Sequence, residues 1–267
     1  MPVYSGMTLL SEKLVTSNQG VPGWFDNLTK NTTVRLVYID GSDQSLHFAP
    51  RDIKWSFIFK RELLRNDPTR HKRGIFPLPF GAFDRWIYPP IQKSIFLSYL
   101  ANRYNNPLRN LIHFELASYG RTDFLLGNTG ESSNTGKLLI GNTHTYTQML
   151  RNSLCSVSAP GAGFDCARFY EILGAHTLLI AYEPPIEMPN PFIDGIHLLY
   201  FSSLSELREK VDFVLSSPIS KIIEIINAGK NHFVEFHTSL ARARYLLETL
   251  ENRLYDCQLI NMNELNV

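Results

Sequence analysis

The chain has 267 residues, of which 44% are hydrophobic, and a formal net charge of +1. It can therefore bury a substantial core, and its composition gives no reason to expect a nucleic-acid partner. Three cysteines without metal-ligand spacing exclude a disulfide framework or a zinc knuckle. No basic segment followed by a long apolar run opens the chain, and no stretch has the length of a membrane span. These features predict a globular, cytoplasmic protein.

The first part of the chain is expected to form a short domain over residues 1–92. The sequence predicts one or two helices over 7–30, an apolar strand over 33–43 that ends in a polar turn, and a segment at 52–65 that begins as a strand. Residues 73–90 are apolar but interrupted by prolines, which is typical of an edge strand and of a connection between domains.

From residue 93 onward, predicted strands alternate with predicted helices. The strands are expected at 93–100, 121–128, 154–160, 176–184 and 196–201, and the helices at 106–120, 143–153, 165–175 and 203–217, followed by a helical tail over 218–255. A polar loop is expected at 132–137. The alternation predicts an α/β fold in which a parallel sheet with right-handed crossovers forms a second domain over 93–267.

A glycine turn inside this second domain stands out. Gly161 and Gly163 follow a buried strand, where glycine permits positive φ and a close approach of a ligand. The next helix is expected to begin near Asp165, and its free N–H groups would favour phosphate oxygens. Arg168 in its first turn opposes the helix dipole but could grip a diphosphate, and Glu171 on the same face could bind a ribose diol. An ordinary ion pair on a solvated helix face carries equal weight.

Three segments then carry a family resemblance: "YTQMLRNSLCSVSAPGAGFDCARFYEILGAHTLLIAYEP", "PFIDGIHLLYFSSLSELREKVDFVLSSP" and "IINAGKNHFVEFHT". They resemble the C-terminal, donor-binding half of GT-B glycosyltransferases, nearest to the exostosin-like and group-1-like branch. The resemblance covers roughly residues 33–240 and is most specific over 146–207. It implies a GT-B-like fold with two Rossmann-like domains, the N-terminal one short and on the acceptor side.

The resemblance also implies an activity, the transfer of a sugar from a nucleotide-sugar donor to a hydroxyl of a glycan or glycoconjugate acceptor. A UDP-sugar is favoured and a GDP-sugar is the alternative, with no further cofactor, no metal and no nucleic acid. Homo-oligomer formation stays open. The donor-binding positions would be Gly161, Gly163, Asp165, Arg168 and Glu171. The retaining branch has a glutamate at the position of Gly163, so the resemblance favours an inverting reaction.

An inverting reaction needs a general base. Asp40 and Asp43 close a predicted strand at its carboxyl end, where α/β sheets present ligand-contacting residues, although Asp40 could equally stabilise its own turn. His47 is the reserve candidate. The other expected cleft residues are Lys60, Gly81 and Tyr146. Because the first domain is short, a catalytically silent nucleotide-sugar-binding or assembly subunit remains the alternative function.

Overall fold

The computed structural model describes residues 8–11, 36–43, 45, 55–67, 74–103, 106–128 and 143–264. The chain divides into two compact units. The first unit comprises Met1–Pro79, Pro185–Pro189 and Arg244–Val267, and the second comprises Phe80–Pro184 and Asn190–Ala243. The chain thus first passes from the first unit to the second after Pro79, whereas the sequence predicts a domain boundary after residue 92. The helical tail, expected in one domain, is shared by both units.

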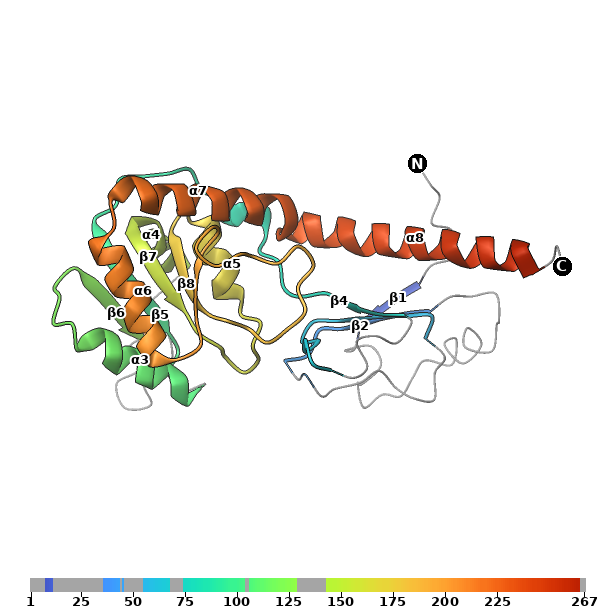
Figure 1. Ribbon diagram of the computed structural model, residues 1–267, viewed down its shortest axis with the longest axis horizontal. Helices are drawn as coiled ribbons and strands as arrows, with labels where there is room; N and C mark the ends of the chain where they lie inside the picture. The colour runs from blue at the N-terminus through green and yellow to red at the C-terminus, as the bar shows by residue number, and fades with distance from the viewer. Residues whose placement is uncertain are drawn as a thin grey trace. The chain divides into compact units, whose positions relative to one another are not determined.

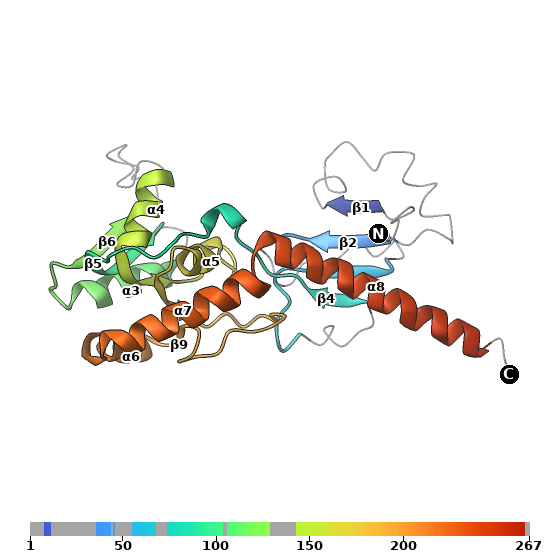
Figure 2. The ribbon, with the colours of Figure 1, turned by 90° about the horizontal axis from the view of Figure 1, so that it is seen from above.

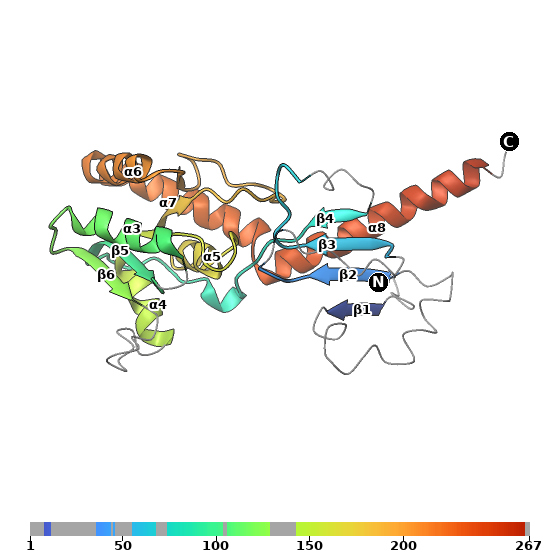
Figure 3. The same cartoon turned by 90° about the horizontal axis from the view of Figure 1, so that it is seen from below.

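The first unit contains a four-stranded sheet whose strands are all parallel. Its order is β1-β2-β3-β4, with the bounds Thr8–Ser11, Leu36–Asp40, Phe57–Lys60 and Ile75–Pro77 (Figure 3). β4 lies at the edge and ends on a proline, as the interrupted apolar run predicts. The prediction of a helix over 7–30 is wrong for Thr8–Ser11, which form β1. Residues 12–30 lie outside the described part of the chain.

Helix α8, Ser239–Glu264, supplies part of the core of the first unit. Leu246 and Leu250 pack with Val37, Phe57 and Phe59 of the sheet. An apolar side chain buried in this way contributes about 1.5–3 kcal/mol relative to exposure. The excursion Pro185–Pro189 also belongs here, because the Glu187 N–H donates to the Leu63 carbonyl at 2.7 Å. Segments far apart in sequence therefore make up this unit.

The second unit contains a five-stranded parallel sheet in the order β6-β5-β7-β8-β9. The strands are β5 (Ile95–Ala101), β6 (Phe124–Asn128), β7 (Ser153–Ser158), β8 (Leu178–Tyr182) and β9 (Leu199–Phe201). All five strands predicted after residue 93 are present. Counted along the chain, their spatial order is 2-1-3-4-5, which is a doubly wound arrangement.

Helices cover both faces of this sheet, as Figures 1 and 2 show. They are α3 (Pro107–Ala117), α4 (Thr143–Asn152), α5 (Ala167–Gly174), α6 (Leu204–Ser216) and α7 (Ile219–Phe236). α4 lies on one side of β5 and β6 and α6 on the other (Figure 3). The strands can consequently be apolar on both faces, which is why they read as continuous hydrophobic runs in the sequence.

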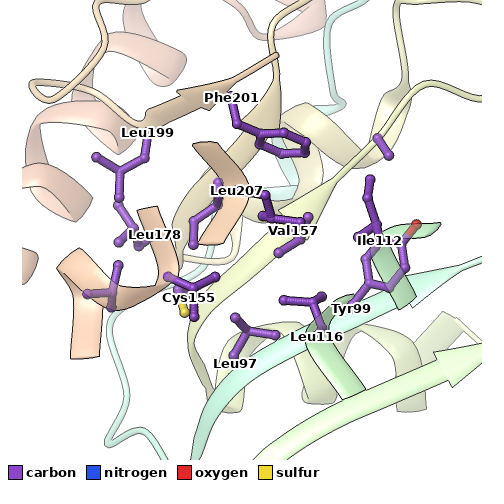
Figure 4. Packing of buried hydrophobic residues seen from close by; sticks show 14 of the residues in the cluster. Leu97, Tyr99, Ile112, Leu116, Cys155, Val157, Leu178, Leu199, Phe201 and Leu207 are labelled. Carbon is purple, nitrogen blue, oxygen red and sulfur yellow. The ribbon is translucent and has the colours of Figure 1, made fainter. Parts of the chain in front are cut away.

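The core between the sheet, α3 and α6 is closely packed (Figure 4). Leu97 and Val157 from the strands meet Leu116 of α3 and Leu207 of α6, and each of these side chains is at most 1% exposed. Apolar residues therefore recur at the spacing that keeps one helix face against the sheet. This core positions the carboxyl ends of β5 and β7.

Local signals set the helix ends. The Asn106 side chain accepts from the Leu108 N–H at 3.0 Å and caps α3, which begins on a proline. Ser203 caps α6 by accepting from the Glu206 N–H at 3.2 Å. The Glu206 carboxylate in turn accepts from the Ser202 N–H at 2.8 Å, one residue before the N-cap, so the contacts form a shifted variant of a capping box.

Two glycines allow backbones to approach closely in the second unit. A Cβ at Gly174 of α5 would collide with the Trp86 carbonyl oxygen, and one at Gly229 of α7 would collide with the His197 carbonyl oxygen. Both obstacles are backbone atoms, which cannot rotate away. Glycine is therefore required at both positions by contact rather than by backbone conformation.

The end of α7 carries a fully buried histidine. His237 Nε2 lies 2.9 Å from the Asn190 carbonyl oxygen, to which it must donate. Its Nδ1 accepts from the Arg242 guanidinium at 2.6 Å. Both nitrogens are thus used by the neutral ring. Burial, followed by the positive charge of Arg242, lowers the pKa of His237 to about 2.

Candidate functional site

The second sheet has a topological switch point between β5 and β7. β5 is followed by its neighbour on one side, β6, and the chain then returns to β7 on the other side. In doubly wound sheets, ligands bind beyond the carboxyl ends of the strands at this switch point. Here these ends are Asn102, after β5, and the segment Ala159–Gly163, after β7.

Arg109 of α3 occupies this position, and the sequence analysis did not single it out. Its Nε donates to the Pro160 carbonyl at 2.8 Å, Nη1 to the Asn102 carbonyl at 3.0 Å and Nη2 to the Ala159 carbonyl at 3.2 Å. The residue is 3% exposed. One guanidinium therefore joins the ends of the two strands across the switch point.

No carboxylate among the described residues lies within ion-pairing distance of Arg109. Burial, and next the positive charge of Arg168, lowers its pKa. No described residue therefore neutralises the positive charge at the switch point, and an arginine remains charged even after such a shift. A sequence signal did exist, because Arg109 stands in the first turn of its helix, against the dipole, just as Arg168 does.

The glycine turn packs directly on this guanidinium. A Cβ at Gly161 would lie 3.0 Å from Arg109 Nη2, so any other residue would press on the arginine. The Gly161 N–H donates to the Gly163 carbonyl at 2.9 Å, and the Asn106 side chain donates to the Gly161 carbonyl at 3.3 Å. Neither Gly161 nor Gly163 has positive φ. The expectation of positive φ is wrong, whereas close approach is the feature that requires Gly161.

Helix α5 begins at Ala167, two residues later than expected. Its N-cap is Cys166, whose side chain makes no capping hydrogen bond. The first N–H groups of the helix thus receive no side-chain cap at the position where an anion would be stabilised by the helix dipole. This terminus follows directly on the glycine turn.

Arg168 lies in the first turn of α5, and its side chain is half-buried. Its Nε and Nη1 atoms are buried and have no hydrogen-bond partner in the described part of the chain. Burial lowers the pKa of Arg168, and neighbouring groups, Tyr146 first among them, raise it by more. A buried guanidinium with unpaired donors is costly without an acceptor, which points to an anionic ligand as the missing partner.

Glu171 is held by an aromatic side chain of α4. The Tyr146 hydroxyl donates to Glu171 Oε2 at 2.9 Å, and the Tyr146 ring lies edge-on to Trp86 with 6.2 Å between centroids. Burial raises the pKa of Glu171, although Tyr146 and Arg168 act in the opposite direction. Glu171 forms no ion pair with Arg168. The two residues are therefore not the solvated surface pair that sequence reasoning left open.

Both carboxylate oxygens of Asp165 accept hydrogen bonds from other residues of the protein. Its Oδ1 accepts from the Tyr170 hydroxyl at 3.1 Å, and its Oδ2 accepts from the Phe80 N–H. The residue is 6% exposed. These contacts favour a role in holding the start of α5 against the segment at Phe80 over the donor-binding role expected from the resemblance.

The structure places the expected base residues in the first unit. Asp40 is 2% exposed, and its Oδ2 pairs with Lys60 Nζ at 2.9 Å. Its Oδ1 accepts from the Ser42 N–H at 3.0 Å and from the Ser42 hydroxyl at 2.6 Å. Burial would raise the pKa of Asp40, but the hydrogen bonds from Ser42 and Lys60 outweigh it and hold the pKa below its ordinary value. Such a carboxylate is a weak proton acceptor.

The other candidate base and the expected cleft residues lie in different surroundings. Asp43 is paired with Arg61, but half of its side-chain surface is exposed. Lys60 is committed to Asp40. Gly81 belongs to the second unit, where a Cβ would lie 2.9 Å from the His237 carbonyl oxygen, so it serves the junction of α7 and α8. His47 lies outside the described residues.

None of the described helices is long and apolar enough to cross a membrane. Among the same residues, no group of three or more His, Cys, Asp or Glu side chains is arranged to hold a metal ion.

Comparison with a family model gives a match over part of the chain. Residues 138–248 match the family described as "Glycosyl transferase-like". The matched region contains α4, α5 and the glycine turn, and hence Tyr146, Arg168 and Glu171. No curated protein sequence matches the chain.

Solved structures share the fold. A glycosyltransferase from Rickettsia africae aligns with a TM-score of 0.61 at 13% identity, covering 84% of this chain and 72% of that one. Sucrose-phosphate synthase from Thermosynechococcus elongatus aligns at 0.60 and 11%, covering 88% and 71%. Anabaena HepE in complex with UDP and glucose aligns at 0.59 and 12%, covering 82% and 72%.

These neighbours confirm the predicted fold class, an α/β fold with parallel sheets like that of GT-B glycosyltransferases. Together with the family match they support the resemblance to group-1-like glycosyltransferases. The exostosin-like branch stays a prediction.

Proposed function

We propose that the chain is a glycosyltransferase that moves a sugar from a nucleotide-sugar donor, with a UDP-sugar favoured, to a hydroxyl of a glycan acceptor. The observation that carries the proposal is Arg168, whose guanidinium has two buried donor atoms without a partner among the described residues. It stands in the first turn of a helix without a side-chain cap, at the switch point of the sheet. An anionic group bound there would remove the cost of those unpaired donors.

The proposed donor contacts follow from the geometry. The N-terminus of α5 and Arg168 would bind the diphosphate, helped by the uncompensated charge of Arg109. Glu171 would accept hydrogen bonds from the ribose hydroxyls through the oxygen that Tyr146 leaves free. The similar structure of HepE with UDP supports a uridine nucleotide as the first ligand to test.

The proposed reaction is an inverting, metal-independent displacement. The acceptor oxygen would attack the anomeric carbon, the bond to the diphosphate oxygen would break, and the acceptor proton would pass to a base. Of the two proposed bases, Asp43 keeps solvent access, whereas Asp40 is buried in its ion pair. If Asp43 is the base, Asp43→Asn lowers kcat by about two orders of magnitude with little change in donor affinity.

The donor site is tested by UDP binding to full-length variants in calorimetry. Arg168→Ala and Glu171→Ala should each weaken UDP binding by about 10- to 100-fold, because each removes charge-assisted hydrogen bonds. Arg208→Ala and Glu209→Ala, both exposed on α6, are the matched controls and should bind like the parent. Parental UDP affinity in both site variants would refute the assigned site.

Two observations favour the second candidate, a silent nucleotide-sugar-binding subunit. Gly163 stands where the retaining branch has a glutamate, and the Asp40 carboxylate is already engaged. The two functions differ in turnover. Slow release of free sugar from UDP-sugars without an acceptor supports the enzyme, whereas tight binding of the same compounds with no release of sugar supports the silent subunit.

A further inference from the structure

A cavity of about 540 Å³ lies in the second unit, away from the proposed donor site. Its walls are mostly apolar, and the main contributors are Ile91, Phe96, Leu154, Ile219, Ile223 and Ile226. The volume falls within the range of small-molecule sites.

The cavity opens at the opposite edge of the sheet from the glycine turn. Its lining residues Lys93, Asp123 and His176 come just before β5, β6 and β8, hence at the amino ends of the strands. Arg168 and Glu171 follow the carboxyl end of β7. A ligand in the cavity would therefore not compete with a donor nucleotide for the same residues.

One wall of the cavity consists of isoleucine side chains, two of which are unusually exposed to solvent for apolar residues. Ile219 and Ile223 are 57% and 44% exposed, and they lie one turn apart on α7 with the buried Ile226 following. Leaving such side chains in water forgoes the free energy that their burial would supply. Both residues line the cavity, so an apolar occupant would cover them.

The other side of the cavity is basic. Lys93 Nζ donates to the carbonyls of Arg151 and His176, each at 2.7 Å, and His176 Nε2 lies 2.9 Å from the Asn227 side-chain oxygen. Arg151 and Lys230 do not line the cavity, but their charges lie near enough to Lys93 to lower its pKa. The Arg151 Nε is buried without a hydrogen-bond partner among the described residues.

These charges are not balanced locally. In the described part of the chain, no carboxylate pairs with Lys93, Arg151 or Lys230. The acidic lining residue, Asp123, is held by Arg121 through contacts of 2.9 and 2.6 Å. Burial, then the charges of Arg151 and Lys230, lowers the pKa of Lys93 to about 8, so most of its amines remain protonated at neutral pH.

We propose that this cavity binds a single-chain amphiphile with an anionic head group, such as a long-chain carboxylate. The alkyl chain would lie against Ile219, Ile223 and Phe96. The head group would face the cations at Lys93, attracted by their charge without displacing the hydrogen bonds that the amine already makes. The assignment rests on the coincidence of an apolar wall with a cluster of uncompensated cations, and it is independent of the proposed transferase activity.

The test uses the full chain and three probes with the same tail: decanoate, decan-1-ol and decyltrimethylammonium, each below its micelle concentration. Calorimetry should show one decanoate bound per chain, about tenfold or more tighter than the other two probes. Ile223→Glu should weaken decanoate binding about tenfold or more. Val234→Glu is the matched control, because Val234 is 40% exposed on the same helix outside the cavity.

Circular dichroism and urea unfolding verify that both variants are folded. Several results would overturn the proposal. Equal affinity for all three probes would remove the role of charge, and parental decanoate affinity in Ile223→Glu would remove the cavity. Binding to anionic lipid vesicles without binding of decanoate would identify a membrane-facing surface instead. Self-association of the parent that Ile223→Glu abolishes would identify a second copy of the chain as the occupant.

Discussion

The Tyr146 hydroxyl donates a hydrogen bond of 2.9 Å to Oε2 of Glu171, so a residue of α4 orients a carboxylate of α5. If Glu171 binds the ribose, Tyr146→Phe should release the carboxylate and weaken UDP binding by about fivefold, the value of one hydrogen bond. The loss should be smaller for 2′-deoxy-UDP, which lacks one of the hydroxyls that the carboxylate would bind. Calorimetry with both nucleotides gives the comparison.

Tyr88→Phe provides the control. It also removes a phenol hydroxyl, but this hydroxyl makes no hydrogen bond to Glu171. This variant should leave both affinities unchanged. An equal loss of UDP and 2′-deoxy-UDP binding in Tyr146→Phe would show that Tyr146 only stabilises the fold.

Arg109 joins the ends of β5 and β7, and its fork of donors cannot be reproduced by an ammonium group. Arg109→Lys should therefore lower the free energy of unfolding by about 2–4 kcal/mol. Urea denaturation measures the change. Arg208→Lys, which alters the pair between the exposed Arg208 of α6 and Glu115 of α3, should cost under about 1 kcal/mol. A parental urea midpoint for Arg109→Lys would contradict the structural role.

The ion pair of Asp40 with Lys60 is buried on both sides. Asp40→Asn should reduce the stability of the chain by about 3–5 kcal/mol, because the buried Lys60 amine loses the charge of Asp40. Adding Lys60→Met should recover much of this loss. Urea unfolding of the parent, the two single variants and the double variant forms the cycle.

The same variants separate structure from chemistry. Restored stability together with restored turnover in the double variant would show that the Asp40 carboxylate takes no part in catalysis. Restored stability with turnover still about a hundredfold low would support Asp40 as the base. An unchanged stability in Asp40→Asn would refute the ion-pair argument.

His237 makes the fold sensitive to acid. Its pKa is about 2 in the folded chain, against about 6.5 when unfolded, so below pH 6.5 the unfolded state binds the extra proton. Stability should therefore fall as the pH drops, by up to about 1.4 kcal/mol per unit from this residue. The neighbouring Arg242, His232 and His197 act in the same direction by opposing a charge on the ring.

Urea unfolding between pH 7 and pH 4.5 measures the effect. His237→Gln keeps a donor and an acceptor at this position and should lose the pH-dependent part, whereas His144→Gln, on the exposed side of α4, should retain it. Parallel profiles for the parent and His237→Gln would contradict the assignment.

Metal independence is a further expectation for the proposed reaction. Positive charge from Arg168 and the N-terminus of α5 would stabilise the departing diphosphate without a divalent ion. Turnover should accordingly survive EDTA within about a factor of two, a change too small to reflect the loss of a metal. Activity that disappears in EDTA and returns with Mn²⁺ would contradict this.

The fold was readable after residue 93 because strands buried on both faces give unbroken apolar runs, and amphipathic helices separate them. Thr8–Ser11 was read as helical because four residues are too few to show a periodicity. The order of the strands and the shared helix α8 could not be predicted. Both depend on contacts between distant segments, such as Leu246 with Phe57.

For the candidate site, the sequence indicated the glycine turn, Arg168 and Glu171, and the family match covers that region. The partner of Glu171 could not be read, because Tyr146 lies 25 residues earlier on a different helix. Arg109 was missed although it opposes its helix dipole as Arg168 does. A rule that flags every cation in a first turn would have found both.

The glycines at 174 and 229 limit how this chain can diversify. Because each faces a carbonyl oxygen of the backbone, no neighbouring substitution can make room for a side chain. Codon randomisation followed by selection for folded protein should leave only glycine at both positions. Gly195, which has positive φ but open space around it, should also admit asparagine. Two residues for which no ligand contact is proposed are thereby closed to substitution, whereas exposed residues of the binding surfaces can change specificity.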